Sequence, residues 1–185
     1  MKVVKKLLAL VLASALALTL LTGCSGGGGG GGGGSEKVPT AGGGSVIMGG
    51  TNNANSDFSR NLIEAIAEDN ITMTYSQAKA EKAQDCVRAM ASIVRSNPDI
   101  DEDELMQEVV KAVGLNTYKE MFFLIEQKST TGQVVETLAY MRALQEAADE
   151  EGYYLDYDEN TFGYVTLDGN GQKAIMIVVG YNMYY

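Results

Sequence analysis

Alternating acidic residues near the middle of the chain have the spacing of calcium ligands. Asp99, Asp101 and Asp103 would take the first, third and fifth positions of an EF-hand loop. Such a loop also needs glycine at its sixth position and glutamate at its twelfth, whereas this chain has Glu104 and Val110 there. The run therefore predicts the beginning of a helix, where the helix dipole stabilises acidic side chains.

A second run closer to the C-terminus repeats this spacing with Asp156, Asp158 and Asn160. Thr161 stands at the glycine position and Leu167 at the glutamate position, so this loop also departs from the EF-hand pattern. A weak calcium site remains an alternative to an ordinary turn here, and we predict no dedicated metal site in the chain.

Nucleophilic catalysis needs an activated group beside a base, and the chain has no histidine. Its two cysteines are Cys24 and Cys86. Cys86 lies on the apolar side of a predicted helix, where cysteine usually behaves as a small hydrophobic residue. Paired carboxylates could hydrolyse a glycan, but no pair stands out among the 24 acidic residues. We therefore predict no catalytic residues and no cofactor.

Tyrosine is concentrated at the C-terminal end, where seven of the ten tyrosines follow Gly152. Tyrosine offers a large contact area with few rotatable bonds and is favoured at binding surfaces. We predict a binding surface that includes Tyr181, Tyr184 and Tyr185. The alternative is that these side chains only cover one face of a sheet.

The N-terminus has the pattern of an export signal. A basic start with Lys2, Lys5 and Lys6 precedes an uncharged, leucine- and alanine-rich run over 7–21. This run is short for a membrane-spanning helix, which needs about 20 apolar residues, and it fits a cleaved signal peptide. The following Leu21-Thr-Gly-Cys24 resembles the lipobox of bacterial prolipoproteins. The resemblance implies cleavage before Cys24 and a diacylglycerol on its sulfur, which would hold the chain at the outer side of the cell membrane.

The chain is predicted to have three parts: a signal peptide at 1–23, a lipidated tether at 24–55 and an acidic domain at 56–185. Nine consecutive glycines occupy 26–34, and such a segment is expected to be a flexible coil. Its reach would be about 30 Å. Without the signal peptide the chain has 11 basic and 24 acidic residues, a net charge of −13. Nucleic acid is therefore excluded as a partner.

The domain is predicted to begin with helices and to end with strands. Apolar spacing and capping residues predict helices over 57–69, 77–96, 100–113, 116–125 and 131–151, with a short strand over 71–75. Ser76, Asp99 and Thr131 are the expected N-caps. Aromatic and β-branched runs over 153–157, 162–167 and 173–179 predict strands, with Asp168-Gly-Asn-Gly171 as a hairpin turn. Helices followed by an antiparallel hairpin or meander place the fold in the α+β class.

The order of these features resembles the CAP superfamily of SCP-like extracellular domains. The matching segments run in the family's order: Asn61-Leu-Ile-Glu64, Met73-Thr-Tyr-Ser76, Lys119-Glu120-Met, Ser129-Thr-Thr131, Val134-Val135 and Phe162-Gly-Tyr-Val165. The resemblance implies an αβα sandwich over about 58–182. The family's cleft uses two histidines and two acids, so a chain without histidine would have lost that metal chemistry. Glu120 matches one cleft acid and joins the predicted binding surface.

Together these features predict a membrane-anchored, extracytoplasmic lipoprotein with a non-enzymatic binding domain. Its partners would be the membrane, through the lipid on Cys24, and an unidentified protein or cell-wall ligand. The alternatives are a carboxylate-dependent cell-wall hydrolase and a purely structural envelope protein.

Overall fold

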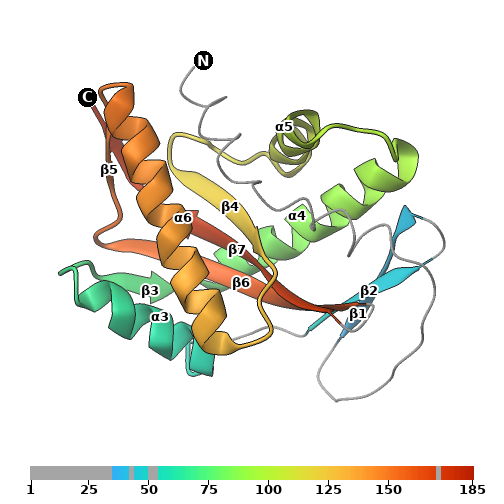
Figure 1. The fold of residues 1–185 in the computed structure, drawn as a ribbon, viewed down its shortest axis with the longest axis horizontal. Helices are drawn as coiled ribbons and strands as arrows, with labels where there is room; N and C mark the ends of the chain where they lie inside the picture. The colour runs from blue at the N-terminus through green and yellow to red at the C-terminus, as the bar shows by residue number, and fades with distance from the viewer. Residues whose placement is uncertain (1–34, 42–43, 50–53, 170–171) are drawn as a thin grey trace.

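The fold is taken from a computed structural model that describes residues 35–41, 44–49, 54–169 and 172–185 (Figure 1). Cys24 and the predicted signal peptide lie outside these residues. Among the described helices, none has both the length and the apolar character needed to cross a membrane.

Two strands form within the segment predicted as a tether, for which the sequence offered a short strand at Val46-Ile47-Met48 as an alternative. β1 (Glu36–Pro39) and β2 (Ser45–Met48) pair antiparallel, and β2 in turn pairs with β6 through Ile47 and Met48. The side chains of Val38, Val46 and Met48 are buried in the core. The prediction of a tether over 24–55 is therefore wrong for this part, because alternate apolar side chains let the segment cover the edge of β6.

The first two helices of the described part of the chain begin at serine caps. α3 (Asp57–Ala67) begins after Ser56, whose side chain accepts a hydrogen bond from the backbone N–H of Ser59. After β3 (Met73–Tyr75), α4 (Gln77–Ser96) begins at the predicted cap, Ser76. A hydroxyl at this position satisfies a backbone N–H that has no partner within the helix.

The next two helices use caps that differ from the predicted ones. α5 (Glu102–Val113) is capped by Asp101 and not by Asp99, because a turn at 97–100 with a buried Ile100 delays the helix by two residues. It ends at Gly114, which adopts the expected left-handed conformation with φ +70°. α6 (Thr130–Glu150) is capped by Ser129 and not by Thr131.

A strand replaces the helix predicted over 116–125. β4 (Glu120–Ile125) has six consecutive buried residues and pairs antiparallel with β7 from Glu120 opposite Gly180 to Ile125 opposite Ile175. The prediction failed because a strand covered on both faces has no alternation of polar and apolar residues, and a short apolar run then resembles a buried helix.

The remaining strands are β5 (Tyr154–Asp156), β6 (Asn160–Gly169), β7 (Gln172–Gly180) and β8 (Asn182–Tyr184). In the described residues the main sheet runs β1-β2-β6-β7-β4, with β3 parallel to β6, and β5 pairs separately with β8. The predicted hairpin is confirmed, since β6 and β7 pair as far as Gly169 and Gln172.

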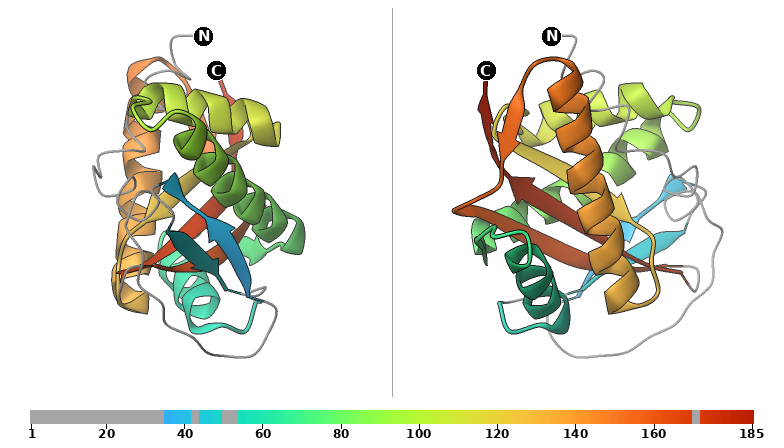
Figure 2. Two further views of the ribbon diagram at one scale, coloured as in Figure 1. Left: turned by 90° about the vertical axis from the view of Figure 1, so that its right-hand side faces the viewer. Right: turned by 60° about the vertical axis from the view of Figure 1, so that its left-hand side comes forward.

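Helices lie on both faces of the main sheet. α3 and α6 lie together over one face, and α4, with α5 packed against it, covers the other (Figures 1 and 2). The structure is therefore α+β, as the sequence predicts. The core lies between these layers and is filled mainly by apolar side chains of β4, β6, β7 and α4.

Candidate functional site

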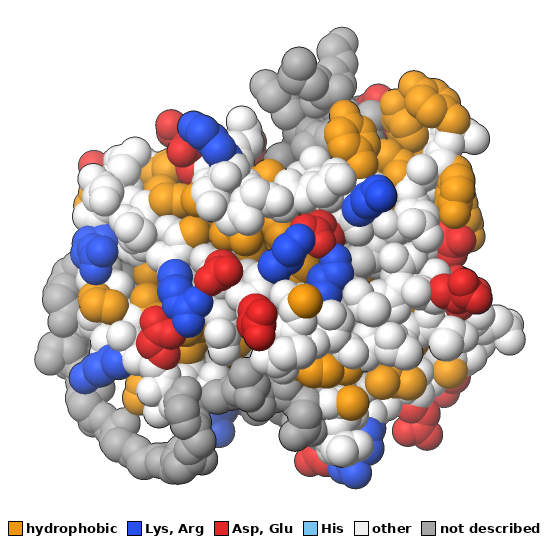
Figure 3. Space-filling view, turned by 180° about the vertical axis from the view of Figure 1, so that it is seen from behind, with side chains coloured by type: hydrophobic (Ala, Val, Ile, Leu, Met, Phe, Trp, Pro, Cys, Tyr) orange, Lys and Arg blue, Asp and Glu red, His pale blue; other side chains and the backbone are white. Residues whose placement is uncertain are grey.

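A groove lies at the end of the sheet where β7 passes into β8. It has a volume of about 530 Å³ and is lined by Tyr118, Lys119, Tyr153, Asn182, Met183, Tyr184 and Tyr185. We call it the tyrosine groove. Hydrophobic side chains gather over this corner of the surface, at the upper right of Figure 3.

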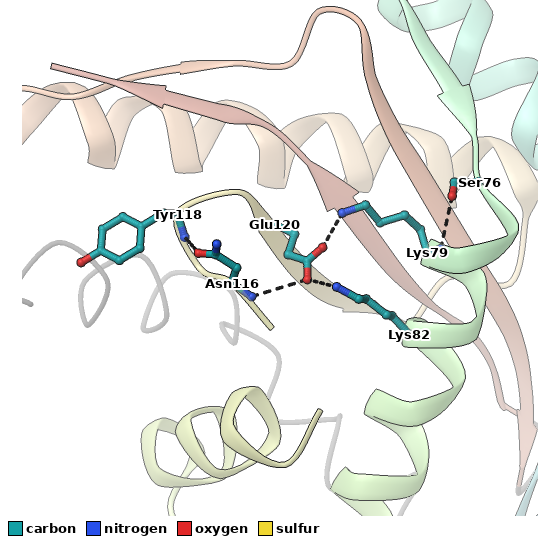
Figure 4. A network of polar contacts seen from close by, with 6 residues as sticks. All are labelled: Ser76, Lys79, Lys82, Asn116, Tyr118 and Glu120. Atoms are coloured by element: carbon teal, nitrogen blue, oxygen red, sulfur yellow. Dashed lines mark hydrogen bonds and ion pairs between the residues drawn. The ribbon is translucent and has the colours of Figure 1, made fainter. Parts of the chain in front are cut away.

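The two walls of the tyrosine groove come from distant parts of the chain. One wall is the run from Asn182 to Tyr185, which includes β8. The other is the loop before β4, where the carbonyl of Asn116 accepts hydrogen bonds from the N–H groups of Lys119 and Glu120, and its side chain accepts one from Tyr118. This turn directs Tyr118 away from the sheet (Figure 4).

The tyrosines of the groove are unusually accessible for large side chains. Tyr118 is 55% exposed, Tyr184 is 52% exposed and Tyr185 is 98% exposed. The hydroxyl of Tyr153 donates a hydrogen bond of 2.8 Å to the hydroxyl of Tyr185, and the centroids of the two rings are 4.5 Å apart. This hydrogen bond is the main cause of a raised pKa at Tyr153.

The prediction that Tyr181 belongs to the binding surface is wrong. Its side chain is 1% exposed, and its hydroxyl donates a hydrogen bond of 2.6 Å to the backbone carbonyl of Thr117. Its ring contacts that of Tyr157 edge-on, with centroids 6.0 Å apart. Burial raises the pKa of Tyr181. Tyr181 therefore supports the loop that carries Tyr118, whereas Tyr184 and Tyr185 reach the surface as predicted.

Glu120 is likewise buried and does not belong to a surface. It is 5% exposed, and its carboxylate accepts hydrogen bonds from Lys79, over 2.5 Å, and from Lys82 (Figure 4). Burial alone would raise the pKa of Glu120, but the two ammonium groups outweigh it and hold the pKa below its ordinary value. A carboxylate held ionised in this way is unsuited to act as a general acid.

The acidic runs singled out in the sequence are used by local structure. Asp101 caps α5 through the N–H of Glu104. In the second run, the Asp156 side chain accepts from the N–H of Asp158, and the Asp158 side chain accepts from that of Thr72. These carboxylate oxygens accept hydrogen bonds from backbone N–H groups. Within the described residues no three His, Cys, Asp or Glu side chains are placed to hold a metal ion.

Cys86 is a buried thiol of α4. Its relative exposure is 0%, and burial, with a smaller contribution from the charge of Asp85, raises its pKa to about 12. A thiol with this pKa is almost entirely protonated at neutral pH and is therefore a poor nucleophile. This is the environment expected for a cysteine on the apolar side of a helix.

Sequence reasoning missed most of the groove. Tyr118 and Lys119 were assigned to a helix, although their place after Gly114 and Asn116 in a turn-forming segment was a signal of an exposed loop. Asn182 and Met183 carry no pattern that distinguishes them from other strand residues. No protein-family model, curated protein or solved structure matches this chain.

Proposed function

We propose that this chain is an extracytoplasmic lipoprotein whose domain binds a ligand, without catalysis, in the tyrosine groove. The observation that carries the proposal is the groove itself, where exposed aromatic rings line a concave surface of about 530 Å³. Convergent aromatic and polar groups in a concave surface are typical of ligand sites. No Asp or Glu is among the residues that line the groove, so it lacks the paired carboxylates that a glycan hydrolase would need.

The proposed resemblance to the CAP superfamily is supported by the order of the elements and by their layering. A helix, a short strand, two helices, a strand, a helix, a second short strand and a hairpin follow one another from α3 to β7, with helices on both faces of the sheet. Lys79 and Lys82 occupy both oxygens of Glu120, the acid that matches the family's cleft. A carboxylate that is paired with two ammonium groups in this way is not available as a metal ligand.

The position of the tyrosine groove suits a domain displayed from a membrane. β2 joins the sheet beside the turn between β6 and β7, whereas the groove lies at the opposite end of β7 (Figure 1). The ten residues of β6 span about 33 Å. We therefore propose that the groove points away from the membrane, toward the cell wall.

Replacing Tyr118 and Tyr184 with alanine is expected to lower recovery of the full chain on cell-wall fractions at least about tenfold. Truncating an aromatic anchor at the centre of an interface usually costs about 2 kcal/mol or more. The matched control is Tyr154→Ala, because Tyr154 is 58% exposed but does not line the groove. Equal recovery of the double variant and the control would refute the groove as the binding site.

The lipid anchor has a separate test. Cys24→Ala is expected to abolish incorporation of labelled palmitate and to release the protein from the membrane fraction, because the sulfur of Cys24 would carry the diacylglycerol. Cys86→Ala is the control, since the buried thiol should make no difference to labelling. Persistent labelling of the Cys24→Ala protein would contradict the lipobox interpretation.

A further inference from the structure

β8 has one paired edge and one open edge. On the first edge it pairs antiparallel with β5, from Asn182 opposite Asp156 to Tyr184 opposite Tyr154. A strand presents backbone N–H and C=O groups on both of its edges. Within the described part of the chain, no hydrogen bond joins the second edge of β8 to a neighbouring strand.

The open edge faces the tyrosine groove because β4 stops short of β8. β4 flanks β7 on the side away from β6, and its pairing ends with Glu120 opposite Gly180. One more hydrogen bond, from the N–H of Tyr181 to the carbonyl of Lys119, continues this alignment. The turn at Asn116 then takes the chain out of the sheet. Tyr118 and Lys119 consequently form a wall that faces the residues from Asn182 to Tyr185 across the groove.

The chemistry of the groove matches an extended peptide. The free N–H and C=O groups of β8 are satisfied by a further strand, and the tyrosine rings on both walls can contact its alternate side chains. Charge restricts the choice further. Lys119 is exposed and forms no ion pair with any described residue, and no Asp or Glu lines the groove, in a chain with a net charge of −10. Lys119 is the charged side chain among the residues that line the groove, and its ammonium group favours a ligand that offers a carboxylate.

We infer that the tyrosine groove binds an acidic peptide segment in extended form, which adds a strand to the open edge of β8. This inference rests on the proposed function, because it names the ligand class of the same groove. Backbone hydrogen bonds to β8 hold the peptide, Tyr118 contacts its side chains, and Lys119 binds a carboxylate. A second copy of this chain pairing through its own β8 is the competing occupant.

The test uses the full chain in detergent and a fluorescent heptapeptide, Thr-Val-Glu-Val-Glu-Val-Thr, with blocked ends. Binding is measured by the fluorescence polarisation of the labelled peptide at a fixed low concentration while the protein is titrated to about 1 mM, the range in which a weak interaction would saturate. Two altered peptides are compared with it: one has alternate backbone nitrogens methylated, and the other has lysine in place of both glutamates. The acidic peptide is also measured against two protein variants, Lys119→Glu and Lys111→Glu. Lys111 is an exposed lysine of α5 and controls for the change in net charge.

The acidic peptide is expected to bind. Methylation of the peptide, its substitution with lysine and the variant Lys119→Glu are each expected to weaken binding at least tenfold. The variant Lys111→Glu is expected to bind the acidic peptide about as well as the parent protein. Equal binding of the methylated peptide would overturn strand addition. Absence of binding by the acidic peptide, while Tyr118 and Tyr184 remain necessary for recovery on cell-wall fractions, would overturn the inference and leave the proposed function standing. A dimer in sedimentation that Tyr118→Ala disperses would overturn it in favour of pairing between copies.

Discussion

Gly163→Ala is expected to lower the free energy of unfolding by about 3 kcal/mol, a large part of the stability of an ordinary domain. Gly163 lies in β6 where α4 crosses the sheet. A methyl group there would lie 2.1 Å from the backbone nitrogen of Ala80, 2.5 Å from the carbonyl carbon of Lys79 and 2.6 Å from the carbonyl oxygen of Ser76. These are backbone atoms of the first turn of α4, so they cannot rotate away as a side chain could. Urea unfolding followed by circular dichroism measures the loss.

Gly114→Ala provides the control for this prediction. Gly114 has φ +70°, and a methyl group there would meet no atom within 4 Å, so its cost is limited to the strained backbone, about 1 kcal/mol. The two variants therefore separate steric contact from backbone conformation. Similar losses in both would show that α4 does not approach β6 as closely as the structure has it.

Glu120→Gln is expected to cost about 3 kcal/mol, because it leaves Lys79 partly buried without a negative partner. Removing one member of a buried ion pair is strongly destabilising for this reason. The side chain of Lys79 is 15% exposed, whereas that of Lys82 is 39% exposed and can turn toward water. Lys82→Met should consequently cost clearly less than Glu120→Gln, and the reverse order would contradict this account of the cluster.

The same carboxylate predicts a dependence of stability on pH. The pKa of Glu120 is lowered in the folded state, so its contribution is complete above the ordinary glutamate pKa of about 4.3 and is lost as the pH falls through the lower folded pKa. Stability of the parent protein should therefore fall more steeply below about pH 4.3 than that of Glu120→Gln. Urea titrations at several pH values measure the two slopes, and parallel curves would exclude Glu120 as the source.

Several local signals in the sequence predicted local structure correctly, although the caps of α5 and α6 lie two residues from the expected ones. The cap at Ser76, the end of α5 at Gly114 and the turn between β6 and β7 were all recognised, because each depends on a few neighbouring residues whose side chains or backbone preferences act over one turn. The α+β class followed from the order of these segments.

Segments whose structure depends on distant partners were predicted less well. The sequence of β4 is an apolar run that fits a buried helix as well as a buried strand. It forms a strand because it pairs with β7, which lies more than fifty residues later in the chain. β1 and β2 follow a glycine-rich segment that does not predict regular secondary structure. β2 forms a strand because it pairs with β6. Such pairings depend on burial that a single segment does not encode.

The sequence by itself determined the composition of the site region: an acidic chain without histidine, with tyrosine concentrated at its C-terminal end. Only the tertiary structure decided which of these tyrosines are exposed. Tyr181 is buried because Thr117 and Tyr157 close over it, and Glu120 is buried because Lys79 and Lys82 reach it from α4. Tyr118 joins Tyr184 and Tyr185 in the tyrosine groove because the pairing of β4 with β7 stops at Gly180, two residues before β8 begins. The exposure of a side chain depends on the residues that the fold places around it, and those residues come from segments far apart in the chain.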